Sequence, residues 1–191
     1  FWNSTDGVVI GQANTIKRTT DAGQSWTTVY QGTNNNEFGR GIEVTPSGYG
    51  MAIGSNGFGR YTTDFGVTWT ALTPPVGFGI PSNLRGVTVE DSSGIAYFYG
   101  ANGFVGKVDL TSLTWTNVSI GVSDLIHGCS FSSPTTGYAV GEDMSAYFTS
   151  NGGTTWTTVG VLPSIPGEDF KAVKTWGSGA NAYAVGTSGI V

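Results

Sequence analysis

The chain repeats one octapeptide, and this repeat restricts its fold more than any other feature of the sequence. Residues 19–26 read TTDAGQSW, residues 62–69 read TTDFGVTW, and residues 149–156 read TSNGGTTW, with Asn in place of Asp. A degenerate fourth copy, residues 109–115, has one additional residue between the Asp and the Trp. The four tryptophans are 43, 46 and 41 residues apart. A repeat of this length is typical of propellers, solenoids and other arrays of one supersecondary unit.

Each octapeptide has the composition of a hairpin turn. An Asp carboxylate can accept hydrogen bonds from backbone N–H groups of its own turn, and the amide oxygen of Asn151 can accept the same bonds. The Gly two positions later permits positive φ, and the Trp begins the next strand, where a large ring can be buried. We therefore interpret the following residues as structural and not catalytic: Asp21, Gly23, Trp26, Asp64, Gly66, Trp69, Asp109, Trp115, Asn151, Gly153 and Trp156.

The pattern S/T-x-D-x-G-x-x-W resembles the Asp-box, also called the bacterial neuraminidase repeat, of sialidases, xyloglucanases, sortilin-type receptors and photosystem II assembly-factor propellers. The similarity is greatest to the last group, in which a Gly-flanked apolar strand precedes a strand ending in Thr and a D-G-G-x-T-W turn. Residues 137–141, 147–149 and 152–156 match these three parts. The resemblance covers nearly the whole chain and implies a β-propeller. It implies less about function, because one scaffold hosts many different sites.

Hydrophobic patterning predicts four short strands in each repeat. Apolar runs close on Gly11, Gly54, Gly100, Gly141 and Gly186, which are 43, 46, 41 and 45 residues apart. The strand before each run begins with a basic and a small residue and then alternates between apolar and polar residues, as a half-buried strand does. The third strand leads into the octapeptide and the fourth begins near its Trp. Only 11% of the residues are charged and 31 are Gly, which favours short strands and tight turns over helices.

Four strands in each repeat of 41 to 46 residues correspond to a propeller blade. We predict an all-β protein, a β-propeller of four-stranded antiparallel blades with four nearly complete blades and a partial fifth. The blades are expected at about residues 1–38, 39–83, 84–124, 125–168 and 169–191. We expect the chain to end at residues 189–191 within the third strand of blade five, as a segment of a larger propeller. The alternative is a five-bladed ring that is closed by mixing terminal strands.

Charge and composition narrow the classes of partner. The net charge of -5 and the pI of about 4.6 disfavour nucleic acid, and no run is long enough to be inserted into a membrane as a helix. One Cys and one His allow neither an intrachain disulfide nor a zinc cluster, so we expect no metal and no cofactor. The Thr-, Ser-, Asn- and Gly-rich composition suggests an extracellular, cell-surface or periplasmic protein. The oligomeric state stays open.

Four basic residues recur at one position of the repeat, where the first strand of a blade begins. They are Arg40, Arg85, His127 and Lys171, which are 45, 42 and 44 residues apart. Side chains at equivalent positions of successive innermost strands point in the same direction. We therefore expect these four side chains to form a ring at one mouth of the central channel. Such a focus of positive potential attracts anions or carboxylates, and Arg adds bidentate geometry. The alternative is that each basic group pairs with a local acid.

Two function classes remain. The first is a non-enzymatic binding or assembly scaffold that acts on a protein or glycan partner through the channel mouth and the loops between blades. The second, implied by the resemblance, is a carbohydrate-active enzyme, sialidase- or xyloglucanase-like, with catalytic residues partly outside this segment. The Phe/Tyr-Arg-Ile-Pro motif of sialidases is absent, and carboxylates such as Glu43, Glu90 and Glu142 show no catalytic pair in the sequence. We therefore favour the scaffold and assign no catalytic residue.

Overall fold

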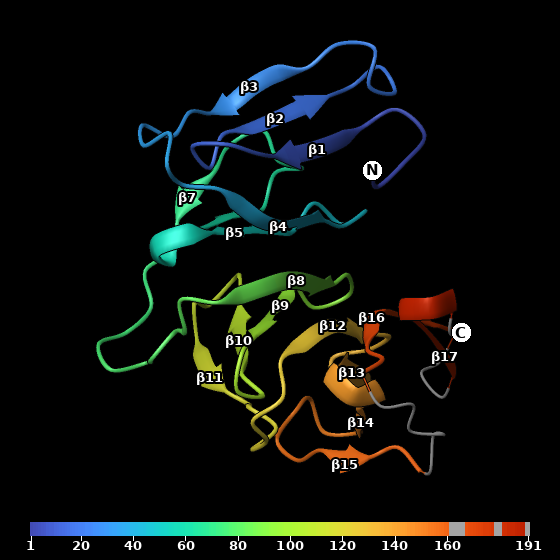
Figure 1. Cartoon of the computed structure of the whole chain (residues 1–191). Coiled ribbons are helices and arrows are strands. Elements are labelled where there is room, and N and C mark those ends of the chain that lie inside the picture. Colours follow the sequence, from blue (N-terminus) through green and yellow to red (C-terminus); the bar gives the residue numbers. More distant parts are fainter. Residues whose placement is uncertain (161–166, 178–180, 190–191) are drawn as a thin grey trace.

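The chain folds into five antiparallel sheets that follow one another in chain order (Figure 1). The computed structural model describes residues 1–160, 167–177 and 181–189. Blade one contains β1 (Gly7–Ile10), β2 (Ile16–Thr19) and β3 (Thr27–Tyr30). Blade two contains β4 (Gly39–Val44), β5 (Gly50–Gly54), β6 (Gly59–Thr62) and β7 (Thr70–Ala71). Blade three contains β8 (Leu84–Glu90), β9 (Ile95–Gly100), β10 (Val105–Asp109) and β11 (Trp115–Asn117).

The remaining strands continue the same pattern. Blade four contains β12 (Ile126–Phe131), β13 (Gly137–Gly141), β14 (Ala146–Thr149) and β15 (Thr157–Thr158), and blade five contains β16 (Phe170–Trp176) and β17 (Asn181–Gly186). Within each sheet every strand pairs with its neighbour in sequence. The prediction of four-stranded antiparallel blades is therefore confirmed for blades two, three and four. Among the described residues no helix is long and apolar enough to span a membrane.

Short turns explain why the strands pair with their sequence neighbours. The turns that follow β5, β13 and β17 are the single 3-10 turns η1 (Ser55–Gly57), η2 (Glu142–Met144) and η3 (Thr187–Gly189). Their central residues have φ of 55°, 51° and 54°, in the left-handed region that few L-residues adopt. Asn and Asp tolerate this conformation better than most residues. The turns η1 and η2 reverse the chain within three residues, so β6 and β14 run antiparallel to the strands before them.

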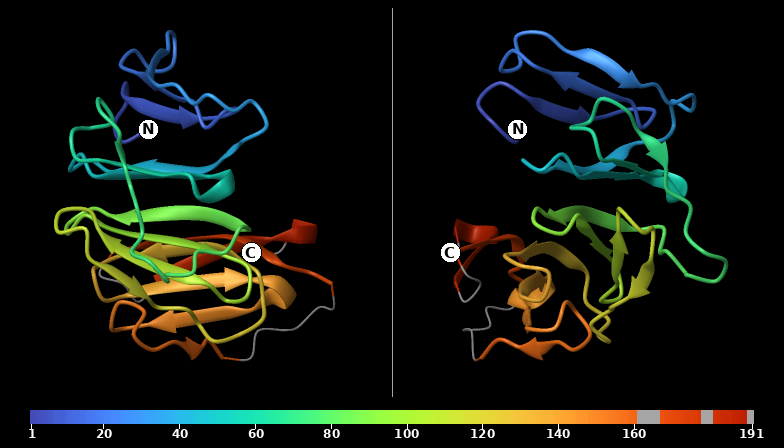
Figure 2. Two further views of the ribbon diagram at one scale, coloured as in Figure 1. Left: turned by 90° about the vertical axis from the view of Figure 1, so that its left-hand side faces the viewer. Right: turned by 180° about the vertical axis from the view of Figure 1, so that it is seen from behind.

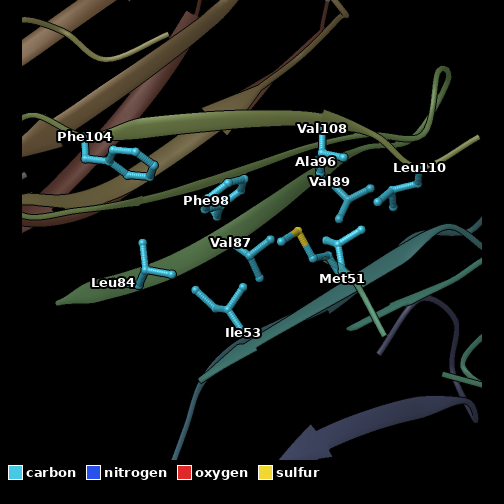
Figure 3. Packing of buried hydrophobic residues seen from close by; sticks show 11 residues of the cluster. Met51, Ile53, Leu84, Val87, Val89, Ala96, Phe98, Phe104, Val108 and Leu110 are labelled. Atoms are coloured by element: carbon cyan, nitrogen blue, oxygen red, sulfur yellow. The ribbon is translucent and has the colours of Figure 1, made fainter. Parts of the chain in front are cut away.

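The hydrophobic core lies between successive sheets. Figure 3 shows Met51 and Ile53 of blade two facing Val87 and Phe98 of blade three. Met51 and Ile53 are 2% and 1% exposed, and Phe98 is fully buried. Sheets that are covered on both faces need apolar residues on both faces of their strands, which is why β9 reads IAYFYG without alternation. Each blade is therefore stabilised by the packing of its neighbours.

The first strands of neighbouring blades approach closely. A Cβ on Gly41 would lie 3.1 Å from the Cα of Gly86, and a Cβ on Gly128 would lie 3.2 Å from the Cα of Ala172. Because these contacts are with backbone atoms, a larger side chain could not be accommodated by a rotamer change. This spacing explains the small residue after each basic residue of the repeat.

Side chains also link the first strands of neighbouring blades. Glu43 Oε2 accepts a hydrogen bond of 2.9 Å from the Val89 N–H of the next blade, and Ser130 Oγ accepts one of 3.0 Å from the Thr175 N–H. Glu43 and Ser130 stand at equal repeat positions, three residues after the basic residue. A polar side chain at this position therefore fixes the register between one blade and the next.

The terminal strands do not share a sheet. In the part of the chain that the structure describes, β1–β3 and β16–β17 belong to two separate sheets, which lie well apart in both further views (Figure 2). A ring closed by mixing terminal strands is therefore not seen. The prediction that residues 189–191 enter the third strand of blade five falls largely on residues 190–191, which lie outside the described residues, and Gly189 belongs to η3.

Candidate functional site

Each of the four recurring basic residues is the extra residue of a β-bulge. In blade two, Gly39 pairs with Gly54 and Gly41 pairs with Ile53, which leaves Arg40 without a partner in the register. The register shifts in the same way around Arg85, His127 and Lys171. A bulge bends its strand and redirects the extra side chain, and bulges are common beside functional sites. We call these four residues, on the adjacent strands β4, β8, β12 and β16, the basic row.

Two members of the basic row are in contact through a carboxylate. Lys171 Nζ lies 3.2 Å from His127 Nε2 and donates a hydrogen bond of 2.6 Å to Asp169 Oδ2. His127 Nε2 lies 3.6 Å from the same oxygen. The hydrogen bond from Lys171 lowers the pKa of Asp169. Partial burial and the Lys171 charge hold the pKa of His127 below its ordinary value, against the opposing effect of Asp169.

The two arginines of the basic row are not neutralised in this way. Arg40 and Arg85 are exposed, and within the described residues neither takes part in an ion pair. The Arg85 charge is near enough to lower the pKa of His127 as well. The charges of Arg85 and Lys171 thus both act on His127. Arg40 is related to these three residues only by its equivalent bulge. Guanidinium groups in this state can bind a carboxylate in bidentate geometry.

The octapeptide turns are held by their Asp side chains. Asp21 Oδ1 accepts hydrogen bonds from the Ser25 N–H at 2.9 Å and the Thr19 hydroxyl at 2.7 Å. Asp21 Oδ2 accepts one of 2.6 Å from the Ser25 hydroxyl. These bonds, chiefly those from Ser25, lower the pKa of Asp21 to about 2. Asp64 accepts the corresponding bonds from the Thr68 N–H, the Thr62 hydroxyl and the Thr68 hydroxyl, at 2.9, 2.7 and 2.6 Å.

The other two copies of the octapeptide, at Asn151 and Asp109, differ from the first two in their hydrogen bonds. Asn151 Oδ1 accepts a hydrogen bond of 2.9 Å from the Thr155 N–H, and its Nδ2 donates one of 2.8 Å to the Thr155 hydroxyl. An amide therefore makes the same backbone contact as the carboxylate. Asp109 instead ends β10 and accepts bonds from the Thr111 and Ser112 N–H groups, at 2.8 and 3.1 Å. The additional residue in this copy produces a different turn.

The four tryptophans occupy similar places with different partners. Trp26 and Trp69 donate Nε1–H to the Gly carbonyl of their own turn, each at 3.1 Å. Trp156 donates to the Val118 carbonyl of the preceding blade at 2.8 Å, and Trp115 packs edge-on against Phe98. Trp69 is buried, and the other three are half-buried. Trp69, Trp115 and Trp156 pack in or against the hydrophobic core, whereas Trp26 packs against Phe1.

The carboxylates considered as catalytic candidates accept hydrogen bonds from backbone N–H groups. Glu43 bonds to Val89 N, and Glu142 bonds to Leu125 N at 3.0 Å. Glu90 is 5% exposed and accepts bonds from both the N–H and the hydroxyl of Ser92 and Ser93. Carboxylates held in this way stabilise turns and blade contacts. Within the described residues no three His, Cys, Asp or Glu side chains are grouped as metal ligands would be.

Sequence reasoning missed Asp169, which binds both His127 and Lys171. The available signal was an acid two residues before the basic residue of blade five, where the other blades carry Phe38, Asn83 and Leu125. The loop candidates are described only in part. The loops at residues 31–38 and 73–83 lie outside the strands, but residues 161–166 of the third loop, with Pro163 and Pro166, are outside the described residues.

The fold is similar to that of solved β-propeller structures. A structure titled YCF48 bound to D1 peptide matches with a TM-score of 0.69 and 16% identity over 97% of this chain and 58% of that chain. YCF48 from Cyanidioschyzon merolae matches with a TM-score of 0.70 and 16% identity over 96% of this chain and 64% of that chain. The present chain thus spans less than two thirds of either protein.

A glycoside hydrolase has a similar fold as well. The GH74 enzyme of Niastella koreensis matches with a TM-score of 0.66 and 20% identity over 91% of this chain and 32% of that chain. No protein-family model matches the sequence, and no curated protein does. At these identities the similarities show the fold, a β-propeller, and leave the function to be argued from the site.

Proposed function

We propose that this chain is a non-enzymatic binding scaffold whose basic row binds the carboxylates of an acidic polypeptide segment. The observation that carries the proposal is the bulge at Arg40, Arg85, His127 and Lys171, which recurs in four neighbouring blades. Two of these residues, Arg40 and Arg85, are exposed and have no acidic partner among the described residues. In a protein of net charge -5, such a cluster concentrates positive potential on one surface.

Two further findings support a scaffold. The candidate carboxylates Glu43 and Glu142 accept hydrogen bonds from backbone N–H groups, and a similar propeller, YCF48, has a structure with a bound D1 peptide. An extended segment could follow the row from blade to blade, so that successive carboxylates meet successive basic residues. In keeping with its composition, we place the protein outside the cytoplasm, on the cell surface, in the periplasm or secreted.

The test is binding of a fluorescein-labelled hexaglutamate peptide to the full chain, measured by anisotropy. We expect binding that weakens as salt is added, because exposed charges are screened. Replacing both Arg40 and Arg85 by Gln should reduce the affinity about tenfold or more, since charge-assisted hydrogen bonds are lost.

The matched control replaces Lys17 and Lys174, which are exposed and outside the basic row, by Gln. It changes the net charge by the same amount as the arginine pair. If both double variants lose affinity equally, the peptide responds only to net charge, and the proposed site is wrong.

The competing function is carbohydrate hydrolysis, which the fold similarity to the GH74 enzyme of Niastella koreensis favours. The scaffold proposal predicts that the purified chain releases no reducing sugar from xyloglucan and no sialic acid from a sialoside. Turnover that disappears when one carboxylate is changed to its amide would replace the scaffold proposal by the enzymatic one.

A further inference from the structure

Asp169 supplies a carboxylate of the chain itself to one pair of the basic row. Its Oδ2 accepts a hydrogen bond of 2.6 Å from Lys171 Nζ and lies 3.6 Å from His127 Nε2. Its Oδ1 accepts a hydrogen bond of 3.1 Å from the Asp143 N–H, which belongs to the turn η2 of blade four. Two basic side chains and one backbone N–H therefore surround this carboxylate.

The backbone that positions Asp169 recurs between blades two and three at Asn83. The Asp169 carbonyl accepts the Thr187 N–H at 3.0 Å, and the Asn83 carbonyl accepts the Ala101 N–H at 3.2 Å. Each of these donors directly follows the Gly that ends the second strand of its blade, and each acceptor stands two residues before the basic residue of its blade. Asn83 and Asp169 therefore hold the same structural position.

The two pairs of basic residues also have the same setting. Arg40 and Arg85 are the extra residues of bulges on adjacent first strands, as His127 and Lys171 are. An added Cβ on the residue after the first member of each pair would lie 3.1 Å from the neighbouring strand in blades two and three, and 3.2 Å in blades four and five. The strands thus approach equally closely in both places.

The backbone donor of the second site is present in the first site as well. Asn56 and Asp143 are the central residues of η1 and η2, with φ and ψ of 55° and 36° in one and 51° and 36° in the other. The Asp143 N–H donates to Asp169, whereas the Asn56 N–H has no acceptor within the described residues. An N–H group in this position can bind an anion from outside the chain.

The sites differ in whether the chain provides the acceptor. Asn83 is exposed and carries an amide in place of the carboxylate of Asp169. The carboxylate of Glu37 contacts the Asn56 side chain at 3.3 Å, but it also accepts bonds from two other Asn side chains. Among the described residues neither Arg40 nor Arg85 forms an ion pair with it. The place between the two arginines therefore lacks the anion that Asp169 provides in blades four and five.

We infer that Arg40, Arg85 and the Asn56 N–H together bind one side-chain carboxylate of the ligand, at the place equivalent to that of the Asp169 carboxylate. Charge-assisted bonds from two guanidinium groups would hold it more strongly than the single Lys171 bond holds Asp169. The inference rests on the proposed function and narrows it. An acidic segment is anchored at blades two and three, because the chain already occupies the other end of the basic row with Asp169.

Asn83→Asp tests the site by providing an internal carboxylate there. We expect it to weaken binding of labelled hexaglutamate to the full chain about tenfold or more, because the peptide must displace the new side chain. The matched control is Asn117→Asp, which adds the same charge on the outer strand β11 of the same blade. Its Oδ1 can still accept the two bonds from Ser119, and binding at physiological salt should change little because distant exposed charges are screened.

The amide of Asn56 reports on the site without any substitution. In the ¹⁵N-labelled full chain, hexaglutamate should shift the Asn56 amide resonance in a saturable way and leave that of Asp143 nearly unchanged, since Asp169 already occupies the latter. In N83D the Asn56 resonance should be displaced before peptide is added and should respond little afterwards. The same spectra show whether each variant is folded.

The outcomes separate this inference from the proposed function. It is overturned if N83D and N117D weaken binding equally or not at all, or if the Asn56 amide of the unaltered chain does not respond to the peptide. If N83D binds normally while the double variant R40Q/R85Q loses affinity, the basic row binds the peptide at another place. If R40Q/R85Q also binds normally, the proposed function itself is wrong.

Discussion

At the scale of the residue, one side-chain oxygen organises each octapeptide turn. In Asp21, Asp64 and Asn151 this oxygen accepts the N–H of the residue four positions later, which closes the turn before the fourth strand. A neutral amide makes this contact as well as a carboxylate does. The geometry of the acceptor therefore matters more to the turn than its charge, and two predictions follow from this difference.

Replacing Asp64 by Ala should lower the free energy of unfolding by about 1–2 kcal/mol, because the Thr68 N–H and two hydroxyls lose their acceptor. The figure is modest because the turn is partly open to water. Asp64→Asn should recover most of the loss, since Asn151 makes the equivalent contact in blade four. Urea unfolding followed by Trp fluorescence measures both variants. Equal destabilisation by Ala and Asn would show that charge, and not geometry, holds the turn.

The pH dependence of stability should reveal the charged turns. The folded pKa of Asp21 is about 2, below the ordinary value of about 4 in an unfolded chain. A carboxyl with a lowered pKa contributes stability that is present above pH 4 or so and is lost as the pH falls toward 2. Asp21→Asn should therefore reduce the loss of stability in this window and leave neutral stability little changed. Thermal unfolding at a series of pH values measures this change in acid stability. The control is Asp124→Asn, which removes a carboxylate remote from the turn.

At the scale of the element, the second and third strands of a blade share a fixed volume. The pairs Ala52–Arg60, Ala139–Tyr147 and Phe98–Gly106 each combine one small and one large side chain. Cores are packed at nearly crystalline density, so neither partner can grow without the other shrinking. Strand pairing across a blade is thus selected by complementary size as well as by hydrogen bonding.

Gly106→Ala should destabilise the protein by about 1–3 kcal/mol through overpacking against Phe98. The Cβ would lie 2.2 Å from the ring carbon, and β10 and β9 are both buried there. The double variant Phe98→Ala, Gly106→Phe moves the ring to the other strand, as in blade four, and should recover part of the stability that Phe98→Ala alone removes. Chemical unfolding of the unaltered chain, Phe98→Ala, Gly106→Phe and the double variant forms a double-mutant cycle, and strict additivity of the two changes would contradict a shared volume.

At the scale of the whole molecule, burial falls from the centre of the chain toward its C-terminal end. In blade three, Ala96, Tyr97, Phe98, Val105 and Val108 are all fully buried, whereas Tyr183 and Val185 of β17 are 64% and 45% exposed. The described strands of blade five therefore bury less apolar surface than those of blade three, and less buried regions open at a lower cost in free energy. The opening of the molecule should therefore begin at blade five.

Native-state hydrogen exchange should rank the blades. Amides of β16 and β17 are expected to exchange first and those of β9 and β10 last, at rates that approach those of global unfolding. The measurement is peptide-resolved exchange by mass spectrometry under native conditions. Faster exchange in blade three than in blade five would contradict the assignment of the core between blades two, three and four.

Binding at the basic row should also depend on pH. Burial and the Lys171 charge lower the pKa of His127, so His127 gains its charge at a lower pH than an unperturbed imidazole does. An acidic ligand favours the protonated form, and its affinity should rise as the pH falls through the pKa of His127, until the ligand's own carboxylates are protonated. His127→Gln should remove this rise while the salt dependence from Arg40 and Arg85 persists. If the affinity of H127Q depended on pH in the same way as that of the unaltered chain, His127 would not belong to the site.

Much of the fold could be predicted from the sequence, because its signals are local. The octapeptide turn forms through contacts within eight residues, and the apolar runs that close on Gly mark the buried second strands. The spacing of Gly54, Gly100 and Gly141 repeats these signals at a length that matches one blade. From these alone followed the all-β class, the four-stranded blades and the turn that contains each Asp, with the exception of the altered turn at Asp109.

The remaining features depend on residues that only the tertiary structure brings together. The spacing of Arg40, Arg85, His127 and Lys171 indicated equal positions, but the bulge that carries each of them arises from pairing with another strand. Asp169 accepts a hydrogen bond from Lys171 and lies beside His127 of the preceding blade. Asp169 and His127 are 42 residues apart in the sequence, so only the fold brings them together. The cavity of about 310 Å³ beside Ala184 likewise exists only because residues of blade four line its other side. Local chemistry thus determined the repeating unit, while contacts between units decided which charges are neutralised and where the surface can accept a partner.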